Sequence, residues 1–259
     1  MAPMELTQSH ADWKTAEPPS NYRVSATILA ASGRISLALS IGRRRVPRRQ
    51  RKAAAAAAAA EASGSATLCF DCGSFSHEMS EAEISALARQ LVQCYGFNRS
   101  LPKPFRFALA GLSTADAVTA ALNVHSAHNW TLQREDAPPW ECFPGKTLIY
   151  LSGDAEEPLG AHEPLNSDVV LVIGGLVDHS AGHAGGARVG AALRVAESHR
   201  IRACKLPIEN FVTVRKPSLT CTAVVQILAG YADTGDWGAA VRGAPAMKCA
   251  PLAKYVRWK

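Results

Sequence analysis

From residue 66 onward, apolar positions follow two alternating patterns, which predict strands and helices in turn. Short apolar runs typical of buried strands occur at 67–71, 105–111, 147–152, 168–175 and 203–208. Apolar residues with helical spacing occur at 80–95, 114–122, 187–199 and 220–232. Because the central strands are apolar on both faces, we expect an α/β domain with a parallel sheet and helices on both faces.

The clearest helix signal is at 80–95. Ser80 and Glu83 have the spacing of a capping box, in which each side chain bonds to the backbone of the other residue. The predicted core face of this helix consists of Ile84, Leu87, Ala88, Leu91 and Val92. The residues therefore predict both where the helix begins and which side is buried.

Residues 1–65 differ from the rest of the chain and are interpreted as a basic extension, largely disordered or helical, before a domain at 66–259. They lack the apolar periodicity expected of a core element. Eight consecutive alanines at 53–60 favour a helix, because alanine has the highest helix propensity.

The net charge of +6 is concentrated in one segment, 43–52, and the rest of the chain is close to neutral. A dense cationic segment attracts polyphosphates such as RNA. A nuclear localisation signal and a solvated linker are the alternatives. The candidate RNA-binding residues of this basic arm are Arg43, Arg44, Arg45, Arg48, Arg49, Arg51 and Lys52.

The cysteines and the hydropathy of the chain indicate in which cellular compartment the protein is expected. Seven scattered cysteines indicate buried thiols in a reducing environment, and no apolar run reaches the roughly 20 residues that a membrane helix needs. Met1 is followed by a polar stretch without the features of a secretory signal. We expect the nucleus or the cytoplasm, with mitochondria as the alternative because residues 18–60 lack acids.

Several segments resemble familiar binding motifs but differ from them in residue spacing or in structural context. The GKT sequence at 145–147 lacks the first glycine of a phosphate-binding loop, and a strand follows it. The glycines after residue 173 do not have dinucleotide-binding spacing. Cys69 and Cys72 form a C-x-x-C pair, but no second pair completes a zinc site, so no metal is predicted. His179 and His183 are interpreted as solvated loop residues, with binding of metal or RNA as the alternative.

The most informative stretch is LVIGGLVDHS at 171–180, where a buried strand ends at Gly174 and Gly175 and a carboxylate follows at Asp178. Ligands of parallel sheets bind at the carboxyl ends of the strands. Glycine lets the backbone approach a ligand closely. The residues therefore place a candidate site here.

Four ordered blocks carry a family resemblance: IYLSGDAEEPL at 149–159, VIGGLVDHS at 172–180, CKLPIENF at 204–211 and VVQILAGYADTGDWGAAV at 224–241. An opening block at 70–100 has an Asp after a strand, a Met-Ser helix start and a Tyr-x-x-Asn-Arg sequence. Together they resemble the tRNA (guanine-9-N1)-methyltransferase family of the SPOUT class, over about residues 66–245.

The resemblance implies a carboxyl-terminal trefoil knot, S-adenosylmethionine as cofactor, and formation of N1-methylguanosine at tRNA position 9. Asp178 is the implied general base, since neutral guanine carries a proton on N1; a helix cap and a cofactor-orienting role are its alternatives. The implied cofactor-binding residues are Leu151, Gly174, Gly175, Asp178, Ala192, Leu206, Pro207, Ser218, Leu219 and Thr220.

The resemblance also implies how tRNA is held. The basic arm is similar to the family's amino-terminal extension, and Gln90, Asn98 and Arg99 match its opening block. These three residues contact tRNA or fix the site, or else form hydrogen bonds at helix ends. A monomer is implied, and a protein partner only if the chain belongs to the mitochondrial branch.

The sequence departs from the family pattern in three places, so other functions remain as alternatives. The stretch between Asp178 and Ala192 is longer than usual, Thr222 stands where relatives often have Asn, and the basic carboxyl end differs from theirs. The alternatives are adenine N1-methylation, a catalytically weak RNA-binding subunit of a tRNA-processing complex, and an unrelated nucleic-acid-binding protein.

Overall fold

A computed structural model of the chain describes residues 22–31, 34–43, 48–62, 64–113, 116–160, 163, 165–177, 188–214, 219–248 and 256–259. The chain forms two compact units, Met1–Arg48 and Arg49–Lys259. The second unit begins earlier than the predicted domain boundary at residue 66.

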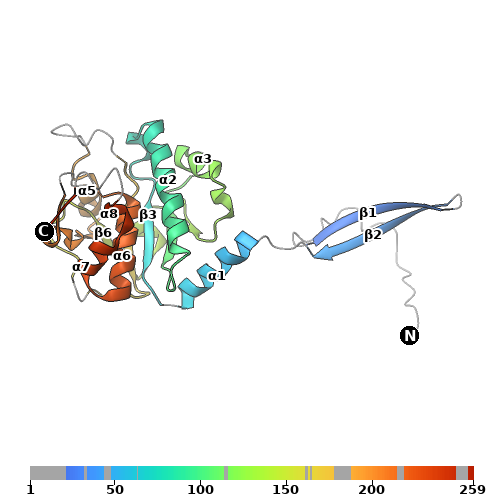
Figure 1. Cartoon of the computed structure of the whole chain (residues 1–259). Coiled ribbons are helices and arrows are strands. Elements are labelled where there is room, and N and C mark those ends of the chain that lie inside the picture. Colours follow the sequence, from blue (N-terminus) through green and yellow to red (C-terminus); the bar gives the residue numbers. More distant parts are fainter. Residues whose placement is uncertain are drawn as a thin grey trace. The chain divides into compact units, whose positions relative to one another are not determined.

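In the first unit, strands β1 (Tyr22–Ala31) and β2 (Arg34–Arg43) form an antiparallel hairpin in which Ala31 pairs with Arg34 (Figure 1). These strands were not predicted from the sequence. The signal was nevertheless present: Ile35, Leu37, Leu39 and Ile41 alternate with small or polar residues. An apolar residue at every second position is typical of a strand.

In the second unit, the alanine run lies within helix α1 (Arg48–Ala62), as predicted. Ala53 and Ala60 are buried. They lie two helical turns apart on one face, which indicates that this face packs on the domain. An ion pair between Glu61 and Arg106 joins the end of α1 to the sheet, with an O–N distance of 3.4 Å.

Six parallel strands form the main sheet, in the order β5-β4-β3-β7-β6-β8. Their bounds are β3 (Thr67–Asp71), β4 (Arg106–Ala110), β5 (Gln133–Arg134), β6 (Thr147–Leu151), β7 (Val169–Gly174) and β8 (Arg202–Cys204). Five of these strands confirm predictions. The sixth, β5, has two residues, too few to show a pattern in the sequence.

Helices cover both faces of this sheet, as expected (Figure 1). The larger core lies against α2 (Glu81–Asn98), α3 (Ala117–Val124), α6 (Cys221–Thr234) and α7 (Trp237–Gly243). The opposite face is covered by α4 (Pro139–Cys142) and α5 (Ala191–Ser198). Shorter elements are η1 (Ser76–Glu78), η2 (Ala127–Asn129), η3 (Pro207–Asn210), α8 (Pro245–Lys248), and the antiparallel pair β9 (Val212–Val214) and β10 (Val256–Trp258).

The start of α2 agrees with its prediction in detail. Both hydrogen bonds of the capping box between Ser80 and Glu83 are present. Ile84, Leu87 and Leu91 of the predicted face are buried. The parallel sheet and its helical layers are thus confirmed, whereas the trefoil knot stays a prediction. None of the described helices is both long enough and apolar enough to span a bilayer.

Candidate functional site

The carboxyl ends of the parallel strands lie along one edge of the sheet, as the sequence predicted. The register pairs Asp71 of β3 with Gly174 of β7, and Leu151 of β6 with Ile173 and Cys204. The loops that follow β6, β7 and β8 therefore leave the sheet side by side. We call this edge, with the start of α6, the carboxyl edge.

Gly175 is a point of backbone contact within this edge. Its amide donates a hydrogen bond to the carbonyl of Asp71, with an N–O distance of 2.8 Å. A Cβ atom at this position would lie 2.6 Å from that carbonyl oxygen. Glycine is therefore needed here for packing between β3 and β7, a requirement other than the predicted approach of backbone to cofactor.

Gly174 has a different surrounding. A Cβ atom there would lie 3.6 Å from the Tyr150 hydroxyl and 3.7 Å from the Cβ of Ala192 on α5. The Cys221 thiol at the start of α6 points to the Gly174 carbonyl, at 4.0 Å. Gly174, Ala192 and the start of α6 thus come together, although they are far apart in the sequence.

Asp71 is a buried carboxylate at the centre of the edge. Its Oδ2 accepts hydrogen bonds from the Tyr150 hydroxyl at 2.8 Å and from the Ser74 Oγ at 2.6 Å. Its Oδ1 accepts from the Ser74 amide at 3.1 Å. Burial, and then the adjacent Asp71 charge, raise the pKa of Tyr150 well above its ordinary value, so its hydroxyl keeps the proton that it donates.

Replacing Tyr150 with phenylalanine is expected to destabilise the domain by about 2 kcal/mol, because a buried charged acceptor loses one donor. For a domain of this size the midpoint of thermal unfolding falls by roughly 4–8 °C. Thermal melts of Tyr150→Phe check this. The matched control is Tyr95→Phe, whose hydroxyl accepts from a neutral amide, that of Thr131. An equal or larger loss in the control would contradict the account.

The other predicted cofactor residues lie on the carboxyl edge or close to it. Leu151 ends β6, and the amide of the next residue, Ser152, bonds to the Cys204 carbonyl at 3.0 Å. Leu206 and Pro207 follow β8 at the start of η3. Thr220 caps α6 by accepting a hydrogen bond from the Ala223 amide, and Leu219 precedes it. Asp178 and Ser218 lie outside the described residues.

Asp178 was also considered as the cap of the helix that follows the loop, and this alternative stays a prediction because Asp178 lies outside the described residues. That helix, α5, has Gly190 at its N-cap position, with φ of 70°. The Gly190 amide donates a hydrogen bond to Asp154 Oδ2 at 3.0 Å, so an acid other than Asp178 accepts from this amide.

Gln90 and Asn98, predicted to contact tRNA, fix the site or bond at a helix end, both bond to backbone. Gln90 Oε1 accepts from the Cys221 amide at 2.8 Å, which places it at the carboxyl edge beside the start of α6. Asn98 is buried, and its amide group bonds to both the amide and the carbonyl of Phe105, each at 2.9 Å. Gln90 is thus suited to hold the site, and Asn98 the turn between α2 and β4.

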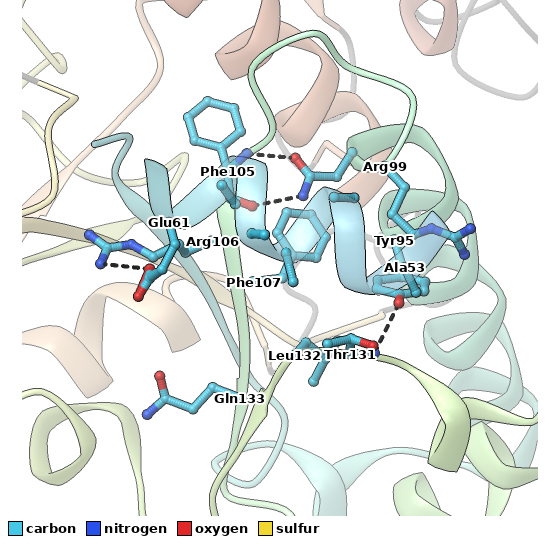
Figure 2. Close-up of a pocket in the computed structure, with 15 residues that line it drawn as sticks. Ala53, Glu61, Tyr95, Arg99, Phe105, Arg106, Phe107, Thr131, Leu132 and Gln133 are labelled. Carbon is cyan, nitrogen blue, oxygen red and sulfur yellow. Dashed lines mark hydrogen bonds and ion pairs between the residues drawn. The ribbon is translucent and has the colours of Figure 1, made fainter. Parts of the chain in front are cut away.

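Arg99 lies away from the carboxyl edge, in a pocket of about 440 Å³ at the amino ends of β4 and β5 (Figure 2). Alanines of α1 form one wall of this pocket, and Tyr95, Phe105 and Phe107 form others. The Arg99 guanidinium carbon is 5.2 Å from the Tyr95 ring centroid. Within the described part of the chain, the buried Nε of Arg99 has no hydrogen-bond partner.

The basic arm is only partly described. Arg48, Arg51 and Lys52 are exposed on the first turns of α1. Arg43 ends β2, and Arg49 lies in α1. Arg44 and Arg45 lie outside the described residues. His179 and His183, which the sequence analysis interpreted as loop residues, also lie outside the described residues.

The C-x-x-C thiols are buried, as predicted for structural cysteines. Burial raises the pKa of Cys69 and Cys72 well above the ordinary value, so both carry protons at neutral pH. Among the described residues, no group of three or more His, Cys, Asp or Glu side chains is arranged to hold a metal ion. Both cysteines thus lie in the core as buried, protonated thiols.

Buried thiols predict a loss of stability in alkali. Burial also raises the pKa of Cys94 in the folded state. Above about pH 8.5 the unfolded chain releases these protons, whereas the folded chain retains them. The unfolded state then binds fewer protons, so the free energy of unfolding falls as pH rises. Urea titrations at pH 7.5 and pH 9.5 in reductant check this, and Cys94→Ala should weaken the dependence. A stability that rises over this range would contradict it.

Comparison with known proteins agrees with this architecture. The sequence model of the family described as tRNA (guanine(9)-N(1))-methyltransferase TRM10/TRM10A matches residues 32–248. The tRNA methyltransferase 10 homolog B of Mus musculus is 31% identical over 186 residues, covering 68% of this chain and 55% of that protein. Homolog A of Homo sapiens is 30% identical over 172 residues, covering 66% and 48%. The chain spans about half the length of these curated relatives.

Solved structures show the same fold. The complex of full-length spTrm10 with SAH has a TM-score of 0.59 at 22% identity, covering 70% of this chain and 95% of that one. The structure of spTrm10(74) has a TM-score of 0.60, also at 22% identity. Because the family match extends over the whole main sheet and its carboxyl edge, this chain belongs to the tRNA (guanine(9)-N(1))-methyltransferase TRM10/TRM10A family.

Proposed function

We propose that this chain transfers a methyl group from S-adenosylmethionine to N1 of guanine at position 9 of tRNA. The observation that carries the proposal is the family match over residues 32–248, which includes every strand of the main sheet. The solved relative spTrm10 was crystallised with SAH, the demethylated form of this cofactor.

The carboxyl edge suits such a cofactor. It places the half-buried backbone of Gly174 near the buried apolar side chains of Leu151 and Leu206, which suit the flat face of an adenine ring, whose polar edge needs backbone partners. The residues proposed to hold the cofactor are Leu151, Gly174, Ala192, Leu206, Pro207, Ser218, Leu219 and Thr220. Gly175 stabilises the backbone next to these residues, because its amide donates a hydrogen bond to the Asp71 carbonyl.

Asp178 is proposed as the general base. When bound, the cofactor supplies an activated sulfonium methyl group. The Asp178 carboxylate would accept the N1 proton of guanine, which leaves the N1 lone pair free to take the methyl group that the cofactor would supply. Orientation of the two reactants contributes much of the rate acceleration. Adenine N1 has a free lone pair, so methylation of adenine would depend less on Asp178.

The basic arm is proposed to bind tRNA phosphates, with Arg48, Arg51 and Lys52 exposed for contact. Changing these three residues to alanine should weaken tRNA binding. It should also flatten the dependence of affinity on salt, since each lost phosphate contact removes about 0.7–0.9 from the logarithmic slope. Alanine at the exposed Lys103, Lys146 and Lys248 removes the same charge elsewhere and is the control. Equal weakening by both triple variants would contradict a specific role for the arm.

Methyl transfer from labelled S-adenosylmethionine to unmodified tRNA transcripts tests the function. Paired transcripts differ only in G or A at position 9. We expect label in the G9 transcript alone. Equal or greater labelling of the A9 transcript would favour the adenine alternative. Cofactor binding without transfer would favour a catalytically weak RNA-binding subunit.

A further inference from the structure

Strand β10 lies beside the carboxyl edge, and its residues follow the segment that the family model matches. It pairs antiparallel with β9, which follows η3 in the chain. The amide of Lys259 donates a hydrogen bond to the Phe211 carbonyl at 3.0 Å, and its ammonium group donates to the Glu209 carbonyl of η3. Since η3 begins at Pro207, just after β8, these bonds hold β10 next to a loop that is proposed to hold the cofactor.

Trp258 of β10 is an aromatic side chain with much of its surface open to solvent. Its cross-strand partner, Val212, is buried, whereas Trp258 is 45% exposed. In the part of the chain that the structure describes, the other exposed large apolar side chains are Val124 and Val189, which are aliphatic. Bases of single-stranded RNA stack on aromatic side chains, and every base has a flat face for this contact. Trp258 therefore offers a surface on which a base can stack.

The residue before this tryptophan, Arg257, is an exposed cation. Successive strand residues point to opposite faces, and Arg257 shares its face with the exposed Thr213. No acid among the described residues forms a salt bridge with Arg257, whereas Arg202 of β8 pairs with Glu157 and Glu163. A guanidinium without a carboxylate partner keeps its donors for other anions, and its planar fork matches the oxygens of a phosphate.

The surroundings of β10 are also positively charged. The guanidinium carbon of Arg242, an exposed residue of α7, lies 6.0 Å from the Phe211 ring centroid. Phe211 is the residue whose carbonyl accepts from Lys259, so Arg242 lies near the end of β10. The acid of η3, Glu209, is paired with Lys205 at 3.1 Å. Positive charge therefore exceeds negative charge among these residues, which attracts polyphosphate.

We propose that Arg257 and Trp258 bind tRNA beside the nucleotide that is methylated, a role that rests on the proposed function. A nucleotide offers both a flat base and a phosphate, which match a tryptophan ring and an arginine fork. Among the described strands, β10 pairs with β9 alone, so its other edge faces no strand. RNA that follows this edge reaches both faces of β10, and hence both side chains. The target base must leave its stack to reach the cofactor, so the neighbouring nucleotides need a surface to bind.

Removing the tryptophan should weaken tRNA binding without changing its dependence on salt. We expect Trp258→Ala to raise the Kd for tRNA by about 5- to 150-fold, the usual effect of deleting one stacking side chain. Trp258→Phe, which keeps an aromatic ring, should restore most of the affinity. Arg257→Ala should weaken binding and also lower the logarithmic slope of affinity against salt by about 0.7–0.9, because one phosphate contact is lost. Filter binding of tRNA at several salt concentrations measures both quantities.

Two control variants remove similar side chains at other places. Val124→Ala truncates an exposed apolar residue at the end of α3, and Lys103→Ala removes an exposed cation in the turn before β4. Both should leave tRNA affinity unchanged, and every variant should keep the thermal midpoint and the SAH affinity of the unmodified chain. Unchanged tRNA affinity in either Trp258→Ala or Arg257→Ala, equal losses in the controls, or a loss of SAH affinity would overturn the proposal.

A photoreactive side chain locates the contact on the RNA. With p-benzoylphenylalanine in place of Trp258, we expect crosslinks to tRNA nucleotides close to position 9. An absence of crosslinks, or crosslinks confined to nucleotides far from position 9, would overturn the proposal. Methyl transfer by the unmodified chain distinguishes the two proposals. Transfer with unchanged tRNA affinity in the variants would overturn the role of β10 alone, whereas tRNA binding through β10 without transfer would overturn the proposed function and leave β10 as an RNA-binding strand.

Discussion

Asparagine in place of Asp178 is expected to slow methyl transfer to G9 tRNA by about 10²- to 10⁴-fold, the usual contribution of a positioned general base. Asparagine has nearly the shape of aspartate, but its amide does not accept the N1 proton. Affinity for the cofactor and for tRNA should change little. Single-turnover transfer from labelled cofactor, with saturating enzyme, measures the chemical step alone.

The control for this substitution is Asp168→Asn. Asp168 is an exposed acid at the amino end of β7 that pairs with Lys146 at 3.1 Å, so its loss should leave the transfer rate unchanged. If Asp178→Asn retained more than a tenth of the rate, Asp178 would not be the base. A large loss of SAH affinity in this variant would instead indicate the cofactor-orienting role.

Alanine in place of Gly175 is expected to destabilise the domain by about 1–3 kcal/mol and to abolish detectable cofactor binding. The new Cβ would lie 2.6 Å from the Asp71 carbonyl oxygen and 3.2 Å from the Cys72 Cα. Both are backbone atoms of β3 and its following loop, so relief requires β7 to move away from β3. That movement would displace the loop after β7, where the cofactor is proposed to lie.

Two other glycine variants serve as comparisons for Gly175→Ala. A Cβ atom at Gly96 in α2 would meet no neighbouring atom within 4 Å, so Gly96→Ala should stabilise the fold by about 0.5–1 kcal/mol. Gly174→Ala meets a side-chain atom, Phe75 Cε2, at 3.2 Å, and should cost less stability than Gly175→Ala. Thermal melts and calorimetric titration with SAH measure both properties. Normal stability and SAH binding in Gly175→Ala would contradict the account.

The elements most reliably predicted were those with strong local signals. The apolar run at 168–175 predicted β7, and the spacing of Ser80 and Glu83 predicted the start of α2. The hairpin at 22–43 was missed because the surrounding arginines, serines and alanines outweighed a visible alternation. The pairing of β9 with β10 could not be predicted, because it joins two three-residue segments that are distant in the sequence.

The sequence predicted where in the fold the site lies better than it predicted which residues of the site contact one another. A strand ending at Gly174 indicated the carboxyl edge, and parallel strands necessarily end together there. The bond between Asp71 and Tyr150 joins residues 79 positions apart and depends on which strands are neighbours in the sheet. The roles of Gln90 and Asn98 likewise depend on what each meets, the start of α6 in one case and the turn before β4 in the other.

Nucleoside analysis of tRNA treated with this chain and S-adenosylmethionine tests the central claim most directly. After digestion, mass spectrometry of the fragment that contains position 9 identifies both the modified base and its place. We predict N1-methylguanosine at position 9, formed by the unmodified chain and strongly reduced with Asp178→Asn. N1-methyladenosine, a methyl group at another position, or no methylation would contradict the claim.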